Sequence, residues 1–149
     1  MKKLSIKNQK GFTLIELLVV IGILAVLLAI VLIAINPARQ FAQANDTKRR
    51  NDSLQILNAV WQYAAENNGN LPAGLTTTQL EISTTGANIC ADLVPTYMTA
   101  LPVDPSLNQS DVVNCAASYS TGYEASKSAT GRVTIVAPDA QLNPISVSR

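Results

Sequence analysis

The sequence predicts an α+β fold: a long N-terminal helix packed on a small head that contains an antiparallel β-sheet. Three observations predict it. Residues 17–35 contain no charged or polar side chain, residues 54–64 place apolar side chains at helical spacing, and residues 119–137 alternate apolar with polar or small ones. The helix is therefore expected to span a membrane in its first half and to be amphipathic in its second. A chain of 149 residues has room for one small domain besides it.

The apolar segment is flanked by positive charge on one side. Four lysines precede it: Lys2, Lys3, Lys7 and Lys10. A helix over residues 12–35 would be roughly 36 Å long, enough to cross a hydrocarbon core of about 30 Å. Because lysine-rich flanks stay on the cytoplasmic side, we expect the N-terminus in the cytoplasm and the bulk of the chain outside.

Glu16 is a lone carboxylate just inside the start of this segment. An acidic side chain at mid-membrane costs roughly 2.5–3.5 kcal/mol and less near an end, so an unpaired carboxylate there usually has a function. A cut between Gly11 and Phe12 would create an α-amino group four residues before Glu16. An amine and a carboxylate about 4 Å apart attract by roughly 4 kcal/mol at an effective dielectric near 20. The pairing is awkward within one helix and natural between staggered neighbours in a filament.

Residues 10–16, Lys-Gly-Phe-Thr-Leu-Ile-Glu, and the apolar helix after them resemble the class III signal of type IV pilins and type II secretion pseudopilins. The resemblance implies that a prepilin peptidase cuts after Gly11 and methylates Phe12, and that Glu16 registers each incoming subunit on its neighbour. It also implies a pilin-like fold and the following division: a leader at residues 1–11, a transmembrane and filament-core helix at 12–35, an amphipathic helix at 36–68 and a globular head at 69–149.

Three functions remain open. The resemblance implies first a prepilin, a single-pass precursor in the bacterial inner membrane that the assembly machinery polymerises into an extracellular type IV pilus. The first alternative is a pseudopilin, whose short rod stays in the periplasm. The second alternative, of another class, is a monomeric membrane-anchored extracytoplasmic binding domain in which Glu16 snorkels to the interface. Only the two polymers need the carboxylate of Glu16.

The second helix is expected to begin at Pro37 after an Asn36 cap, because proline fits the first turn of a helix but breaks its interior. Gly69 and Pro72 then mark its end near Asn68. Its apolar stripe should pack on the sheet and contains Leu54, Ile56, Leu57, Val60, Trp61, Tyr63 and Ala64. The polar residues expected on the opposite face are Asp52, Gln55, Gln62 and Glu66.

A mixed-charge cluster lies earlier in this helix and contains Asp46, Lys48, Arg49, Arg50 and Asp52. Two interpretations stay open: a solvated helix face, or a surface that meets neighbouring subunits and helps to set their register. A DNA-binding patch at residues 48–50 is a weaker third. Removing residues 1–11 would leave seven basic side chains against 10 acidic ones, a balance that disfavours a nucleic-acid surface.

The head is expected to contain short strands joined by turns. Residues 80–82, 119–125 and 133–137 read as strands, residues 127–131 as a hairpin connection, and residues 112–115 as a further strand. A helical turn is expected within residues 91–101. Residues 102–105 form a rigid proline-flanked loop.

The two cysteines, Cys90 and Cys115, lie in the part expected outside the membrane, where a disulfide is favoured over two buried free thiols. Closing a loop of about 25 residues stabilises by roughly 3–4 kcal/mol. The chain has no histidine and no Gly-rich phosphate loop, and acids such as Asp104 and Asp111 are scattered through loops. We therefore expect no enzyme, no metal site and no cofactor.

Overall fold

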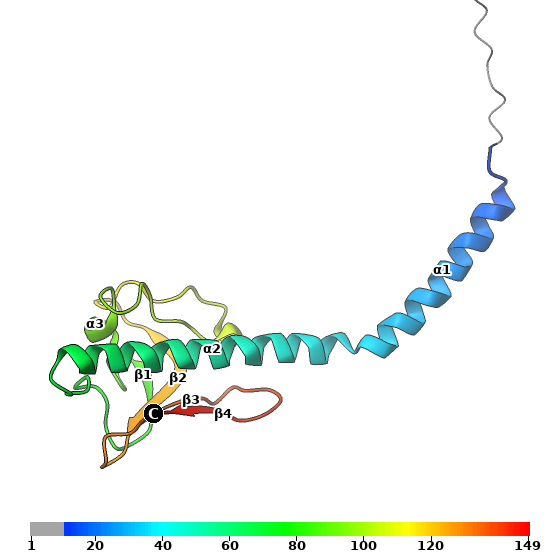
Figure 1. Cartoon of the computed structure of the whole chain (residues 1–149). Coiled ribbons are helices and arrows are strands. Elements are labelled where there is room, and N and C mark those ends of the chain that lie inside the picture. The colour runs from blue at the N-terminus through cyan, green and yellow to red at the C-terminus, as the bar shows by residue number, and fades with distance from the viewer. Residues whose placement is uncertain (1–10) are drawn as a thin grey trace, which may run out of the picture. The chain divides into compact units, whose positions relative to one another are not determined.

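The computed structural model describes residues 11–149 and divides into two compact units, one ending at Gln40 and the other comprising Phe41–Arg149 (Figure 1). Residues 1–10 of the expected leader, which include its four lysines, lie outside the described residues.

The first unit contains one long helix, α1, at Leu14–Ile35. Thr13 caps its N-terminus, and Asn36 ends it in the left-handed conformation, with φ of 47°. Helix α2, at Pro37–Glu66, starts at the next residue. The Asn36 carbonyl accepts the Arg39 backbone N–H at 3.1 Å, so Asn36 closes one helix and supplies the first acceptor of the next. The predicted helix break at Asn36 and Pro37 is therefore present.

Helix α2 ends two residues before the predicted Asn68. Asn68 and Gly69 both have positive φ, and the Gly69 N–H bonds the Ala64 carbonyl at 2.8 Å. A left-handed residue just after the last turn is a common way to satisfy helix carbonyls, and glycine adopts it without steric penalty.

The second unit contains a four-stranded antiparallel sheet in the order β1-β2-β3-β4. The strands are β1 (Leu80–Ser83), β2 (Ser120–Lys127), β3 (Val133–Ala137) and β4 (Ile145–Ser148). Figure 1 shows α2 lying along the sheet. The core joins Ile56 and Val60 of α2 to inward-facing residues of the strands, including Tyr123 and Ile135. The predicted α+β architecture is confirmed in this unit.

Two predictions about the strands need correction. Residues 112–115 form no strand, because only Val112 pairs, through an isolated bridge to Leu101, and Val113 is 69% exposed. The remaining strand is β4, which the sequence did not predict. Four residues with two serines carry too weak a period to stand out, and β4 is defined by its pairing with β3. The other elements are short: a helical turn, α3 (Cys90–Leu93), and a 3₁₀ turn, η1 (Pro105–Leu107).

The buried face of α2 also differs from the prediction at its N-terminal end. Ile56, Leu57, Val60 and Ala64 are buried as predicted, but Leu54 is 42% exposed. The same helical stripe continues backwards through Ser53, Asp52 and Arg49, all of them buried. The predicted placement of Asp52 on the polar face is therefore wrong, since Asp52 lies one helical turn before the buried Ile56.

Candidate functional site

The N-terminus of α1 holds Glu16 in a capping box. The Thr13 backbone N–H and hydroxyl donate to Glu16 Oε2 at 2.7 and 2.8 Å, and the Glu16 N–H donates to the Thr13 hydroxyl at 3.3 Å. This arrangement satisfies N–H groups at the first turn that lack helical partners. Glu16 Oε1 takes no part in these bonds, so it remains available to another group.

The prediction that Glu16 is unpaired is wrong within one chain, because Thr13 donates to it twice. The signal was present, since Thr-x-x-Glu immediately before an apolar run is the pattern of a capping box. Within one chain the carboxylate therefore already has two donors. Its negative charge also lies at the helix end where the macrodipole is positive, which is favourable for an acid.

The bond between Gly11 and Phe12 precedes the helix. Both residues are exposed, Phe12 to 84%, and residues 11–13 belong to no helix or strand. This bond is therefore sterically open in the structure. Glu16 follows in the first turn of α1.

Helix α1 buries none of its side chains. Among residues 11–149 it is the one helix long and apolar enough to cross a membrane. So large an apolar surface is not stable in water and requires lipid or other apolar helices around it. Gly22 leaves a shallow, open notch on the surface of the helix, between the side chains of Leu18, Val19, Ile23 and Val26. Small residues such as Gly22 let helices approach closely within a membrane.

A buried ion pair connects α2 to the loop before η1. Arg49, with no exposed surface, donates from Nε and Nη2 to the two carboxylate oxygens of Asp104 at 2.7 and 2.9 Å. Burial disfavours the charged form of Asp104, but the hydrogen bonds from Arg49 and Ser106 outweigh it and lower the pKa of this carboxyl group. Arg49 also donates from Nη1 to Asp46 at 2.9 Å.

A second set of contacts continues this network towards β2. Asp52 Oδ2 accepts from Lys48 Nζ at 2.7 Å and from the Tyr123 hydroxyl at 2.8 Å. Burial, together with the hydrogen bond to Asp52, raises the pKa of Tyr123. Lys48 donates in addition to the Val103 carbonyl at 3.1 Å.

These contacts correct the interpretation of the charged cluster. Arg49 and Asp52 are internal residues that join α2 to the rest of the head, so neither belongs to a solvated face. Asp46 is also engaged, since its carboxylate accepts the backbone N–H groups of Gln141 and Leu142. Asp104 could not be separated from other loop acids in the sequence because its partner lies 55 residues away.

Cys90 and Cys115 form a disulfide, as predicted, with their Cα atoms 5.4 Å apart. Cys90 begins α3, and Cys115 lies in the segment that precedes β2. The bond therefore attaches that segment to the core. Within residues 11–149 no group of three His, Cys, Asp or Glu side chains is arranged to hold a metal ion.

Comparison with known proteins gives one match. Residues 6–32 match a family model described as the prokaryotic N-terminal methylation motif. The match includes Gly11, Phe12 and Glu16, and it extends into α1. No curated protein and no solved structure matches the chain.

Proposed function

Because residues 6–32 carry the class III signal of type IV pilins and pseudopilins, we propose that the chain is a prepilin, the structural subunit of a type IV pilus. A prepilin peptidase cuts after Gly11 and methylates Phe12, and the processed subunit polymerises through α1. In this role the protein is not an enzyme and needs no cofactor.

The observation that carries the proposal is the combination of this motif with a fully unburied apolar helix. The 22 residues of α1 are long enough for a membrane span of about 33 Å. The same surface can leave lipid only if other apolar surfaces replace it. Identical α1 helices of neighbouring subunits supply that replacement, so one helix serves first as anchor and then as filament core.

The capping box supports the role proposed for Glu16. Thr13 holds the carboxylate at the first turn through Oε2. Oε1 can then accept a hydrogen bond from the positively charged α-amino group of Phe12 in a neighbouring copy. Pairing removes the cost of an uncompensated charge in an apolar environment. A subunit in the wrong register would leave one acid and one amine unpaired.

The proposed route starts in the inner membrane. The precursor spans it once with its N-terminus in the cytoplasm, where the peptidase acts, and its head lies outside. Assembly machinery then transfers the mature subunit from lipid into the growing homopolymer. The motif supports a pseudopilin of a type II secretion system equally well, in which case the fibre is a short periplasmic rod.

The decisive test combines N-terminal mass spectrometry with charge variants of Glu16. We expect the native protein to begin with methylated Phe12, and electron microscopy of sheared surface material to show long fibres. Glu16→Gln retains the capping hydrogen bonds but removes the charge, so it should abolish fibres. Glu16→Asp keeps the charge on a shorter side chain and should retain partial assembly. A native chain that begins at Met1, or normal fibres from Glu16→Gln, would overturn the proposal.

A further inference from the structure

We propose that β4, the strand at one edge of the sheet, pairs with β4 of a second copy of this chain, in an antiparallel orientation centred on Val147. The contact lies in the head and makes no use of α1 or Glu16. It is therefore separate from the polymerisation proposed above.

The hydrogen-bond pattern of the sheet leaves the outer edge of β4 open. The Val133 N–H donates to the Arg149 carbonyl at 2.9 Å, and the Arg149 N–H donates to the Val133 carbonyl at 3.0 Å. In antiparallel strands, residue pairs that exchange both bonds alternate with pairs that exchange none. Ser148 and Ser146 lie one and three residues before Arg149 in the same register, so they belong to the second kind. Their backbone N–H and C=O groups consequently point away from β3.

The two edges of the sheet differ in how the chain covers them. At one edge, the Glu81 carbonyl of β1 accepts the Ala87 N–H at 2.7 Å, so the turn after β1 engages that strand. At the other edge, no segment of residues 11–149 outside the sheet hydrogen-bonds the backbone of Ser146 or Ser148. Both serines are exposed. The groups that could accept a further strand are therefore free at β4.

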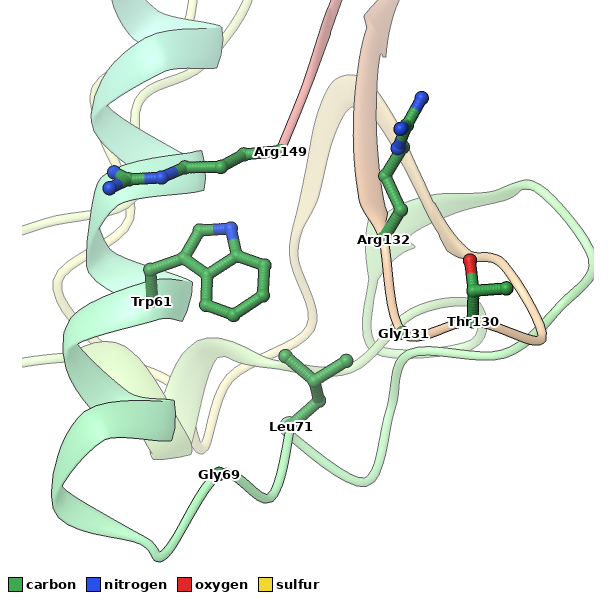
Figure 2. A pocket seen from close by; sticks show the side chains of 7 residues that line it. All are labelled: Trp61, Gly69, Leu71, Thr130, Gly131, Arg132 and Arg149. Carbon is green, nitrogen blue, oxygen red and sulfur yellow. The ribbon is translucent and has the colours of Figure 1, made fainter.

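Strand β4 also lacks the features that usually protect an open edge, which are charged side chains, an internal proline or a bulge. Its four residues, Ile-Ser-Val-Ser, carry no charge and no proline, and they pair with β3 without a shift in register. Arg149 follows the strand, but the alternation puts its side chain on the core face of the sheet. Figure 2 shows it extending past Trp61 towards α2. Its charge is therefore directed away from the edge.

A second copy of β4 matches these free groups. They are arranged symmetrically about Val147, so an antiparallel copy places Ser146 of each chain opposite Ser148 of the other. Every outward N–H then has an acceptor, and every outward C=O has a donor. No like charges meet, and serine hydroxyls that face one another across two strands can hydrogen-bond.

Val147 adds an apolar contact at the centre of this pairing. Its side chain is half-buried and packs on the core from the edge of the sheet. In the proposed register the two Val147 residues form a non-hydrogen-bonded pair, in which the Cα atoms are about 4.5 Å apart and the side chains are close. Each valine would cover apolar surface that the other leaves exposed in a single copy.

The symmetry decides which copies can meet in this way. The two-fold axis is perpendicular to the sheet, and α2 lies along the sheet (Figure 1), so the axis reverses the direction of α2. Two heads joined through β4 therefore point in opposite directions. In the fibre proposed above, neighbouring subunits point the same way, so this contact would join two fibres and not two neighbours within one.

Cross-linking of the full chain in neutral detergent micelles tests the register. Val147→Cys places two thiols opposite each other in the paired strands, whereas Ala129→Cys places a thiol at the exposed tip of the β2–β3 turn. Under mild oxidation, we expect Val147→Cys to form disulfide-linked dimers at least about tenfold faster, because pairing raises the local thiol concentration. Equal rates for the two variants would show random collision and overturn the proposal.

Two charge variants test the same register without a cross-link. Ser146→Lys combined with Ser148→Lys places lysine opposite lysine, and Ser146→Lys combined with Ser148→Glu places lysine opposite glutamate. In sedimentation experiments on micelle-bound chains, we expect the first variant to dimerise at least about tenfold more weakly than the unaltered chain and the second to dimerise at least as well. Equal dimerisation of the two variants contradicts the proposed pairing.

Glu16→Gln separates this proposal from polymerisation, since it alters α1 and should dimerise through β4 as the unaltered chain does. Circular dichroism would verify that each variant is folded. An unaltered chain that stays monomeric in micelles, together with no preferential cross-linking of Val147→Cys, overturns the β4 contact whether or not fibres form.

Discussion

The guanidinium of Arg49 binds the carboxylate of Asp104 through two hydrogen bonds of 2.7 and 2.9 Å in the interior of the head. One residue lies in α2 and the other in the loop before η1. Asp104 also accepts the Ser106 N–H and hydroxyl, so the same carboxylate caps that 3₁₀ turn. The pair therefore determines how this loop is placed against the helix.

Removing either partner of this pair should destabilise the head strongly. Arg49→Ala leaves Asp104 buried without a counter-charge, and loss of one member of a buried pair typically costs about 3–5 kcal/mol. Denaturant unfolding of the full chain in micelles, followed by circular dichroism, measures this. Arg50→Ala is the control, because Arg50 is exposed and should change stability by less than about 0.5 kcal/mol. Equal effects of the two substitutions would contradict a special role for Arg49.

The same pair predicts a loss of stability in acid. The folded state lowers the pKa of Asp104, so the ionised carboxyl group stabilises the fold at pH values above the unfolded pKa of about 3.9. That contribution is lost as the pH falls from there through the lower, folded pKa. Unfolding free energies measured between pH 6 and pH 2 should show the decline. In Asp104→Asn the total stability should be lower at pH 6 and the acid-dependent slope smaller; an unchanged slope would assign it to other carboxyl groups.

Breaking the capping box should separate the local and intermolecular roles of Glu16. Thr13→Val removes the hydroxyl that both donates to Glu16 and accepts its N–H, which should cost about 1 kcal/mol at the start of α1. We expect fewer fibres by quantitative microscopy, because the carboxylate is less firmly oriented. Thr13→Ser keeps the hydroxyl and should assemble normally. If Thr13→Val assembles as well as Thr13→Ser, orientation by Thr13 is irrelevant.

Removing the disulfide should weaken the head without changing its fold. Cys90 and Cys115 are 25 residues apart, and a loop of that length predicts a loss of roughly 3–4 kcal/mol in the Cys90→Ser, Cys115→Ser double variant. Thermal unfolding with and without reductant measures this loss in the unaltered chain. The double variant should no longer respond to reductant. A response of similar size in that variant would show that the reductant acts elsewhere.

The hydrophobic pattern was sufficient to predict the main elements. A run of apolar residues reads as a membrane-length helix whatever surrounds it, and strict alternation identified β2 and β3. It was not sufficient for β4 or for the segment around Val112. In such short segments strand formation depends on whether a partner strand lies alongside, and the pairing of β4 with β3 is a tertiary contact.

For the charged residues, the difference between what local sequence predicts and what tertiary contacts decide is larger. Composition placed Asp52 and Arg49 on a polar surface, because ionised side chains are rarely buried without partners. The partners exist, but Asp104 and Tyr123 lie 55 and 71 residues away, and no local spacing links them.

The amino-acid order alone therefore determined the N-terminal signal, the apolar span, the position of Glu16 and the α+β pattern, because each depends on neighbours within a few turns of chain. Folding in three dimensions decided which charges are internal and which strand completes the sheet. Those outcomes depend on contacts between distant segments. The energies of these contacts arise only after folding has brought the partners together and removed the water between them.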